Sequence, residues 1–165
     1  MARRRVSAGI LLYRHTAAGE LEVLLGHPGG PYFARKDAGH WSIPKGEVDD
    51  GEGDLRDVAL REFAEETGRA LDVSHDDLLP LGEIVQKGGK TVVAWAVEGD
   101  LDPDTAHSNT FPLEWPPRSG RTIDVPEIDR VAWCTPDAAR ALVKPTQIPL
   151  IDRLQAILVR PSGAR

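Results

Sequence analysis

The sequence predicts one domain of the α/β or α+β class, and three observations lead to this prediction. Its 165 residues are enough for a single domain with a sizeable apolar core. Hydrophobic residues make up 41% and charged residues 28%, a balance that is typical of a globular chain and excludes a disordered one. Apolar runs typical of strands and segments with helical periodicity follow one another in the order strands, helix, strands, helices.

The first half of the chain is predicted to hold three strands, a long loop and one helix. In chain order we expect a strand over 6–13, a turn over 17–20, a strand over 21–25, a loop over 27–40 and a short strand over 41–44. A helix is predicted over 54–67, because Gly68 at its end suits the left-handed conformation in which many helices terminate.

The second half is predicted to hold a hairpin, a further strand and two short helices. We expect strands over 79–86 and 91–98 around a Lys-Gly-Gly-Lys turn, a strand over 128–134, and helices over 136–143 and 147–158. Residues 99–126 show no stable period and contain five prolines, which predicts a long loop that is either functional or disordered.

Composition and charge exclude several classes of function. Twenty lysines and arginines against 26 aspartates and glutamates give a net charge of −6, so bulk binding to nucleic acid is not expected. No apolar run approaches the roughly 20 residues of a membrane helix, and residues 1–5, although basic, are not followed by the pattern of a secretory signal. The single cysteine, Cys134, excludes a disulfide framework and favours a cytoplasmic protein.

Nine of the 26 acidic residues lie between Glu47 and Glu66, and three of them share one face of the predicted helix. Glu62, Glu65 and Glu66 are spaced at i, i+3 and i+4, so their carboxylates converge and repel one another. A divalent cation would remove this repulsion, because Mg²⁺ and Ca²⁺ prefer carboxylate oxygens. The periodicity alone leaves a solvated acidic face as an equal alternative.

The segment before the helix makes a metal site the better interpretation. Residues 41–52 read as a strand, a sharp turn and an acidic loop, and the glycine of the turn, Gly46, lets its carbonyl approach an ion. Together with the helix, this stretch resembles the Nudix hydrolase signature, in which Gly46 and Glu52 fit the first part and residues 61–68 the second. One residue too many separates Glu52 from Arg61, and we place the extra residue near the start of the helix.

The resemblance implies a Nudix-type α/β/α sandwich with a mixed β-sheet over residues 1–165, with the signature at about 46–68. It also implies hydrolysis of a phosphoanhydride bond in a nucleoside diphosphate-linked substrate with Mg²⁺ or Mn²⁺. The metal ligands implied by the family pattern are the Gly46 carbonyl, Glu62, Glu66 and Glu65. Glu62 and Glu65 are catalytic candidates, and the general base is either a signature glutamate or Glu127.

Arg61 would hold the acidic loop by pairing with Glu52, although Asp57 or Glu65 on the helix could take it instead. Substrate contacts are predicted at five positions outside the acidic cluster: Lys45, Arg35, Lys36, Trp115 and Arg121. Lys45 resembles the lysine of the diadenosine-polyphosphate and diphosphoinositol branches and would contact phosphate. Trp115 either stacks on a base or fills the core.

The expected partner is a nucleotide or dinucleotide, with dinucleoside polyphosphates or nucleoside triphosphates favoured, and the protein is expected to be a monomer or homodimer without membrane contact. A calcium loop over residues 49–54 fails, because either register puts Gly46 or Val48 where the first carboxylate is needed. A Nudix fold that only senses a nucleotide remains the alternative to an enzyme. Turnover of any nucleotide would separate the two.

Overall fold

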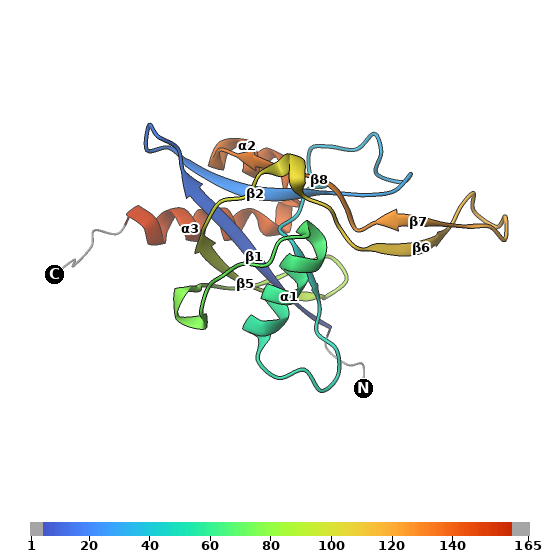
Figure 1. The fold of residues 1–165 in the computed structure, drawn as a ribbon, viewed down its shortest axis with the longest axis horizontal. Helices are drawn as coiled ribbons and strands as arrows, with labels where there is room; N and C mark the ends of the chain where they lie inside the picture. Colours follow the sequence, from blue (N-terminus) through green and yellow to red (C-terminus); the bar gives the residue numbers. More distant parts are fainter. Residues whose placement is uncertain (1–4, 160–165) are drawn as a thin grey trace.

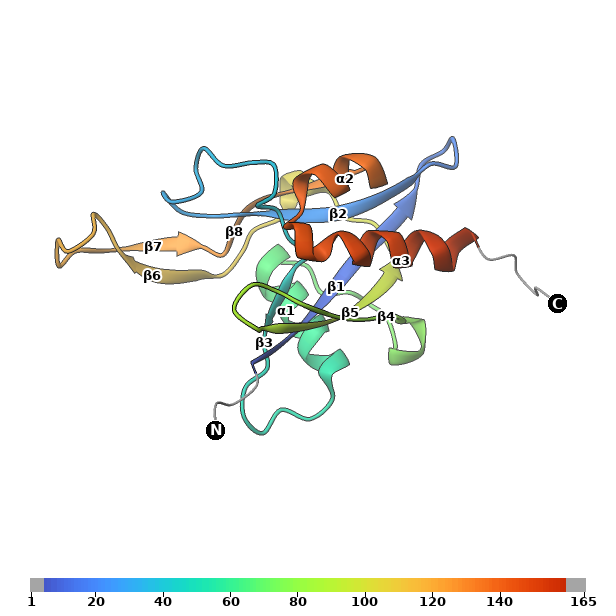
Figure 2. The ribbon, with the colours of Figure 1, turned by 180° about the vertical axis from the view of Figure 1, so that it is seen from behind.

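The computed structural model describes residues 5–159 as a mixed β-sheet between two helical layers (Figure 1, Figure 2). The sheet has the strand order β4-β5-β1-β2-β8, with β3 paired to β1. Its strands are β1 (Val6–His15), β2 (Leu21–Pro28), β3 (Lys45–Glu47), β4 (Leu79–Val85), β5 (Thr91–Glu98) and β8 (Ile128–Cys134). Only the pair β1–β5 is parallel among these ladders. This architecture confirms the predicted α/β fold with a mixed sheet.

One helix covers one face of the sheet and two cover the other (Figure 1, Figure 2). Helix α1 (Leu55–Thr67) packs on the first face, and α2 (Pro136–Leu142) and α3 (Ile148–Val159) pack on the second. Three short 3₁₀ turns complete the helical elements: η1 (His75–Asp77), η2 (Pro103–Thr105) and η3 (Pro145–Gln147). The lengths of α1, α2 and α3 agree with the predicted helices to within a residue or two.

Strand β1 supplies both halves of the core because its side chains alternate between the two faces. Ile10 and Leu12 pack with Phe63 of α1, whereas Leu11 packs on the other face with Leu154 of α3. A strand covered on both faces is apolar at nearly every position, which explains the continuous apolar run in the sequence.

Helix α1 has well-defined ends that fix its rotation on the sheet. The Asp54 side chain accepts from the backbone N–H of Arg56, and Gly68, with φ of 74°, donates its N–H to the Ala64 carbonyl. Burial of Phe63 against β1 then leaves Glu62 and Glu66 beside β3, at the border of the packed interior.

Two expectations from the sequence are wrong: the strand over 41–44 and the long loop over 99–126. Residues 41–44 form only isolated bridges, Gly26 to Ser42 and Trp41 to Val143, and the strand begins just after the predicted range, at Lys45. Residues 99–126 are not one irregular loop but hold a two-stranded ribbon, β6 (Thr110–Glu114) and β7 (Thr122–Pro126), which projects from the sandwich (Figure 1).

Prolines hid the ribbon from the sequence analysis, since Pro112 lies inside β6 and Pro126 ends β7. A two-stranded ribbon has a free outer edge on each strand, and a residue without an N–H is tolerated there. Within residues 5–159, no helix is both long and apolar enough to cross a membrane.

Candidate active site

Four chain segments meet around a cavity of about 250 Å³. They are β3, the second half of α1, the start of β5 and the ends of the ribbon. The residues that line the cavity are Lys45, Gly46, Glu47, Glu62, Glu66, Lys90, Asn109 and Glu127. The structure therefore brings Glu127 to the signature glutamates, although it lies far from them in the sequence.

Gly46 lies so close to Glu62 that a side chain at its position would displace the Glu62 carboxylate. A Cβ atom built on Gly46 would overlap the Glu62 carboxylate. Strand β3 pairs with β1 through Gly46 and Ala8, which holds the glycine backbone against the helix. The need for glycine here is thus one of close approach between β3 and α1.

Two glutamate side chains at this cavity are held in an environment that disfavours their charge. Burial raises the pKa of Glu62 to about 7, and the neighbouring carboxylate of Glu65 adds to this effect. Burial, followed by the charge of Glu62, raises the pKa of Glu66 to about 8, although the Lys45 backbone N–H donates to Glu66 at 3.3 Å.

The residues at this cavity fit a divalent cation. Glu62 Oε2 is buried and has no hydrogen-bond partner among the described residues, and the Arg61 guanidinium lies 3.8 Å away. An unsatisfied buried carboxylate oxygen is costly, and a hard cation bound by carboxylate and carbonyl oxygens would satisfy it. Glu62, Glu66 and the Gly46 carbonyl are the groups available for such an ion.

Arg61 joins the acidic loop to the helix through two carboxylates. Its guanidinium donates to Glu52 at 2.8 and 3.0 Å and to Glu65 at 3.1 Å. Arg61 therefore pairs both with the predicted partner, Glu52, and with Glu65, one of the two alternatives on the helix. Glu52 also accepts from the Asp49 backbone N–H at 2.7 Å, which closes the loop. Glu65 is half-exposed and does not line the cavity with Glu62 and Glu66.

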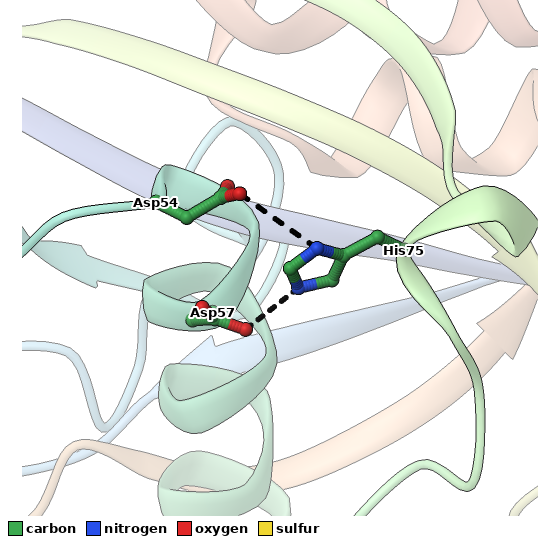
Figure 3. Close-up of side chains that lie close together, drawn as sticks. All are labelled: Asp54, Asp57 and His75. Atoms are coloured by element: carbon green, nitrogen blue, oxygen red, sulfur yellow. Dashed lines mark hydrogen bonds and ion pairs between the residues drawn. The ribbon is translucent and has the colours of Figure 1, made fainter.

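A second group of metal-ligand side chains lies at the other end of α1 (Figure 3). His75 Nε2 lies 2.6 Å from Asp57 Oδ1, and His75 Nδ1 lies 3.7 Å from Asp54 Oδ2. Asp54 is already engaged, because it caps the helix and accepts from the Arg56 guanidinium at 2.7 and 3.0 Å. We interpret this group as an ion-pair cluster that ties η1 to the helix start.

The same end of α1 can accommodate the extra residue relative to the family pattern. Residues 48–54 are non-helical, whereas α1 is regular from Leu55 to Thr67. The register that places Glu62, Glu65 and Glu66 on the helix is therefore undisturbed.

Glu127 lies at the junction of β7 and β8 and is fixed by its backbone. Its N–H donates to the Asn109 carbonyl at 3.0 Å, and its carbonyl accepts from Gly29 at 3.2 Å. The charge of Glu127 contributes to the raised pKa values of Glu62 and Glu66. Glu127 thus faces the signature glutamates and is placed to act on the same substrate.

Three lysines also converge here, and sequence reasoning found only one of them. Burial, and then Lys90 and Lys144, lower the pKa of Lys45 to about 8. Lys90 lies at the hairpin turn before β5, and Lys144 lies between α2 and η3. No local pattern marks Lys90 or Lys144, because their approach to Lys45 depends on sheet order and on the packing of α2.

The remaining predicted substrate residues lie away from the carboxylates. Arg35, Lys36, Trp115 and Arg121 line neither cavity that contains Glu66. Trp115 packs edge-on against Tyr32, with ring centroids 5.2 Å apart, and belongs to neither apolar cluster. The ribbon and the loop 29–40 therefore contact each other beyond the acidic cavity.

His27 anchors that loop, and sequence analysis gave it no role. Its side chain is fully buried, with Nε2 at 2.6 Å from the Lys36 carbonyl and Nδ1 at 2.9 Å from Asp129 Oδ1. A Cβ atom on Gly29 would overlap the Pro126 carbonyl oxygen. The start of the loop is thus packed tightly against the residue that precedes Glu127.

Comparisons with known proteins agree with this geometry. The family model for the NUDIX domain matches residues 3–154. The asymmetrical bis(5'-nucleosyl)-tetraphosphatase of Rattus norvegicus is 45% identical over 62 residues, which are 36% of this chain and 42% of that protein. The chain thus spans about two fifths of the length of the curated relatives it matches.

Two solved structures share this fold over nearly the whole chain. A C. elegans Ap4A hydrolase is 26% identical with a TM-score of 0.61, over 95% of this chain and 100% of that one. The NUDIX domain of Shewanella oneidensis NrtR, solved with ADP ribose, is 16% identical with a TM-score of 0.66, over 96% of this chain and 91% of that one.

Proposed function

The chain belongs to the Nudix family, and on this premise we propose that it hydrolyses a phosphoanhydride bond of a nucleoside diphosphate-linked substrate with Mg²⁺ or Mn²⁺. The observation that carries the proposal is the pair of glutamates, Glu62 and Glu66, with raised pKa values around a buried carboxylate oxygen that accepts no hydrogen bond from the described residues. Carboxylates held in this way are suited to a divalent ion rather than to a structural ion pair.

The proposed metal ligands are Glu62, Glu66 and the Gly46 carbonyl, with Glu65 as a further candidate. When bound, the ion would neutralise phosphate oxygens that otherwise repel an attacking water. Arg61 keeps Glu65 and the loop at Glu52 in place through its three hydrogen bonds. Lys45 supplies a positive charge beside the same cavity and would contact a phosphate oxygen.

Two groups remain candidates for the general base. Glu127 lines the cavity and is held by backbone bonds on both sides, so it could take a proton from the attacking water. Glu65 lies outside the cavity lining but next to Glu62. Water oxygen would attack phosphorus, the bridging oxygen would leave with its phosphate, and the proton would pass to the base.

We favour dinucleoside polyphosphates or nucleoside triphosphates as substrates. Lys45 beside the glutamates and the similarity to an asymmetrical tetraphosphatase and an Ap4A hydrolase support this choice. The outer contacts proposed for the substrate are Trp115, which would stack on a base, and Arg121 beside it on the ribbon. On the adjoining loop, Arg35 and Lys36 would contact distal phosphates. We also propose one domain over residues 1–165, a cytoplasmic location in keeping with the single Cys134, and a monomer or homodimer.

The test is a substrate panel measured with Mg²⁺, with Mn²⁺ and with chelator. Diadenosine polyphosphates, nucleoside triphosphates, nucleotide sugars and diphosphoinositols should be included, and release of phosphate-containing products followed. Glu62→Gln and Glu66→Gln should each lower kcat by about 10²-fold or more, because they remove the charge that binds the ion. Glu20→Gln, on an exposed turn, is the matched control. Near-normal turnover in both site variants would disprove the proposed mechanism.

A further inference from the structure

Lys144 lines a small cavity that adjoins the acidic one. The cavity has a volume of about 140 Å³ and shares Lys45, Glu66 and Glu127 with the larger acidic cavity. Its other walls are formed by Gly26, Pro28, His40, Ser42, Ile43 and Ile128. The two cavities therefore adjoin at Lys45, Glu66 and Glu127, and of the two only the smaller one is lined by Lys144.

Neither lysine of this cavity forms an ion pair with a described residue, although the carboxylates of Glu66 and Glu127 line the same cavity. Within residues 5–159, neither the Lys45 nor the Lys144 ammonium has a carboxylate oxygen within 4.0 Å. Burial and the charge of Lys90 lower the pKa of Lys144, as burial and the neighbouring lysines lower that of Lys45. Two partly buried ammonium groups that form no ion pair are unfavourable for folding, and an anion that reaches both of them in this cavity would be bound.

The size of the cavity limits which anion it can take. Pockets that enclose drug-sized ligands have volumes of about 300–1,000 Å³, so about 140 Å³ is too small for a nucleoside. A phosphoryl group is small, and the lysines and Ser42 offer donors to its oxygens. The cavity is thus suited to one phosphoryl group.

We propose that Lys144 and Lys45 form a phosphoryl-binding subsite that selects substrates with three or more consecutive phosphates. This inference rests on the proposed function, because the acidic cavity would hold the two phosphates on either side of the bond that breaks. The adjoining cavity then receives the next phosphate of the chain. Nucleotides with only two phosphates leave the subsite empty and gain nothing from Lys144.

Isothermal titration with inorganic tripolyphosphate and pyrophosphate in Mg²⁺ buffer tests the subsite without a nucleoside. Lys144→Met nearly keeps the length of the side chain and removes its charge, and it should weaken tripolyphosphate binding about tenfold or more, the range of a charged hydrogen bond. Pyrophosphate binding should change less than about threefold, because that ligand does not need the subsite. Lys144→Arg should retain most of the tripolyphosphate affinity.

Lys87→Met is the matched control, because Lys87 is exposed and its replacement removes the same charge close to Lys144. It should weaken tripolyphosphate binding less than about twofold. Equal losses in Lys87→Met and Lys144→Met, equal losses for both anions, or no tripolyphosphate binding by the wild type would each overturn the subsite. Melting curves establish that the variants are folded, and Lys144→Gln replaces Lys144→Met if the latter is not.

Failure of the proposed subsite can be distinguished from failure of the proposed function. Binding of tripolyphosphate is measured without turnover, with phosphorus NMR to verify that the ligand is intact. A protein that hydrolyses no nucleotide of the panel would reject the proposed function and leave the effect of Lys144→Met readable. Hydrolysis with no preference for three phosphates would reject the subsite alone.

Discussion

Glu66→Gln should change how the stability of the metal-free protein depends on pH. The pKa of Glu66 is raised from 4.5 to about 8, mainly by burial. The folded state therefore binds more protons than the unfolded state between these values, and the free energy of unfolding falls as pH rises through this window. The amide that replaces the carboxylate in the variant stays neutral throughout, so the free energy of unfolding of the variant does not fall for this reason.

The size of the effect follows from the pKa difference. A change from 4.5 to about 8 corresponds to at most about 5 kcal/mol, at about 1.4 kcal/mol for each pH unit. Part of it is repulsion from Glu62, which relaxes when either glutamate takes a proton, so we expect about 2 kcal/mol. Wild type and Glu66→Gln should be about equally stable at pH 4, below both pKa values, and the variant more stable by this amount at pH 9.

Urea denaturation in chelator at pH 4 and pH 9 measures this difference. Taking the difference between variants removes the contributions of the other titrating groups, and Glu20→Gln controls for loss of a surface charge. Mg²⁺ at pH 9 should stabilise the wild type more than Glu66→Gln, because it binds the folded carboxylates. Parallel pH dependences for wild type and Glu66→Gln would refute the assignment of Glu66 as a buried, destabilised carboxylate.

Three further variants test the surroundings of the site. Gly29→Ala should lower kcat, because its Cβ pushes the Pro126 carbonyl and with it the following Glu127, whereas Gly53→Ala, in open space, should be silent in the same assay. Trp115→Ala should raise KM for nucleotides more than it lowers kcat, since stacking adds mostly uniform binding, and an earlier melting transition with unchanged kinetics would instead show a packing role. His27→Ala should cost about 1–3 kcal/mol in urea denaturation by leaving the Lys36 carbonyl without its donor, and an unchanged unfolding midpoint would contradict this anchor.

Local signals were sufficient to predict the acidic helix and most of the sheet. The i, i+3, i+4 spacing of the glutamates and the glycine at 68 depend only on neighbouring residues, and α1 begins and ends as expected. The hairpin of β4 and β5 is likewise marked by its turn. The ribbon of β6 and β7 escaped prediction because the prolines in it argue against strands unless the strand is known to lie at an edge.

The contacts that complete the site could not be predicted, because they depend on which strands become neighbours. His27 meets Asp129 only because β2 pairs with β8, where His27 lies opposite Arg130. Lys90, just before β5, reaches the site because β1 pairs in parallel with β5 and also pairs with β3, the strand that contains Lys45. One sequence does not reveal these strand registers, so cationic residues far from the signature, such as Lys90, could not be assigned to the site.

The charges of the site are arranged for a ligand rather than for the stability of the free protein. Lys45 and Glu66 are neighbours in space, and an ion pair between them would satisfy both. Instead, the Lys45 backbone N–H donates to Glu66, while the Lys45 ammonium stays beyond 4.0 Å, with its pKa lowered to about 8. Both side chains are thus held partly desolvated and without an ion pair to a described residue within 4.0 Å, at a cost in folding free energy. A cation at the glutamates and a phosphate at the lysines would remove both penalties together, so metal and polyphosphate should each bind more tightly in the presence of the other.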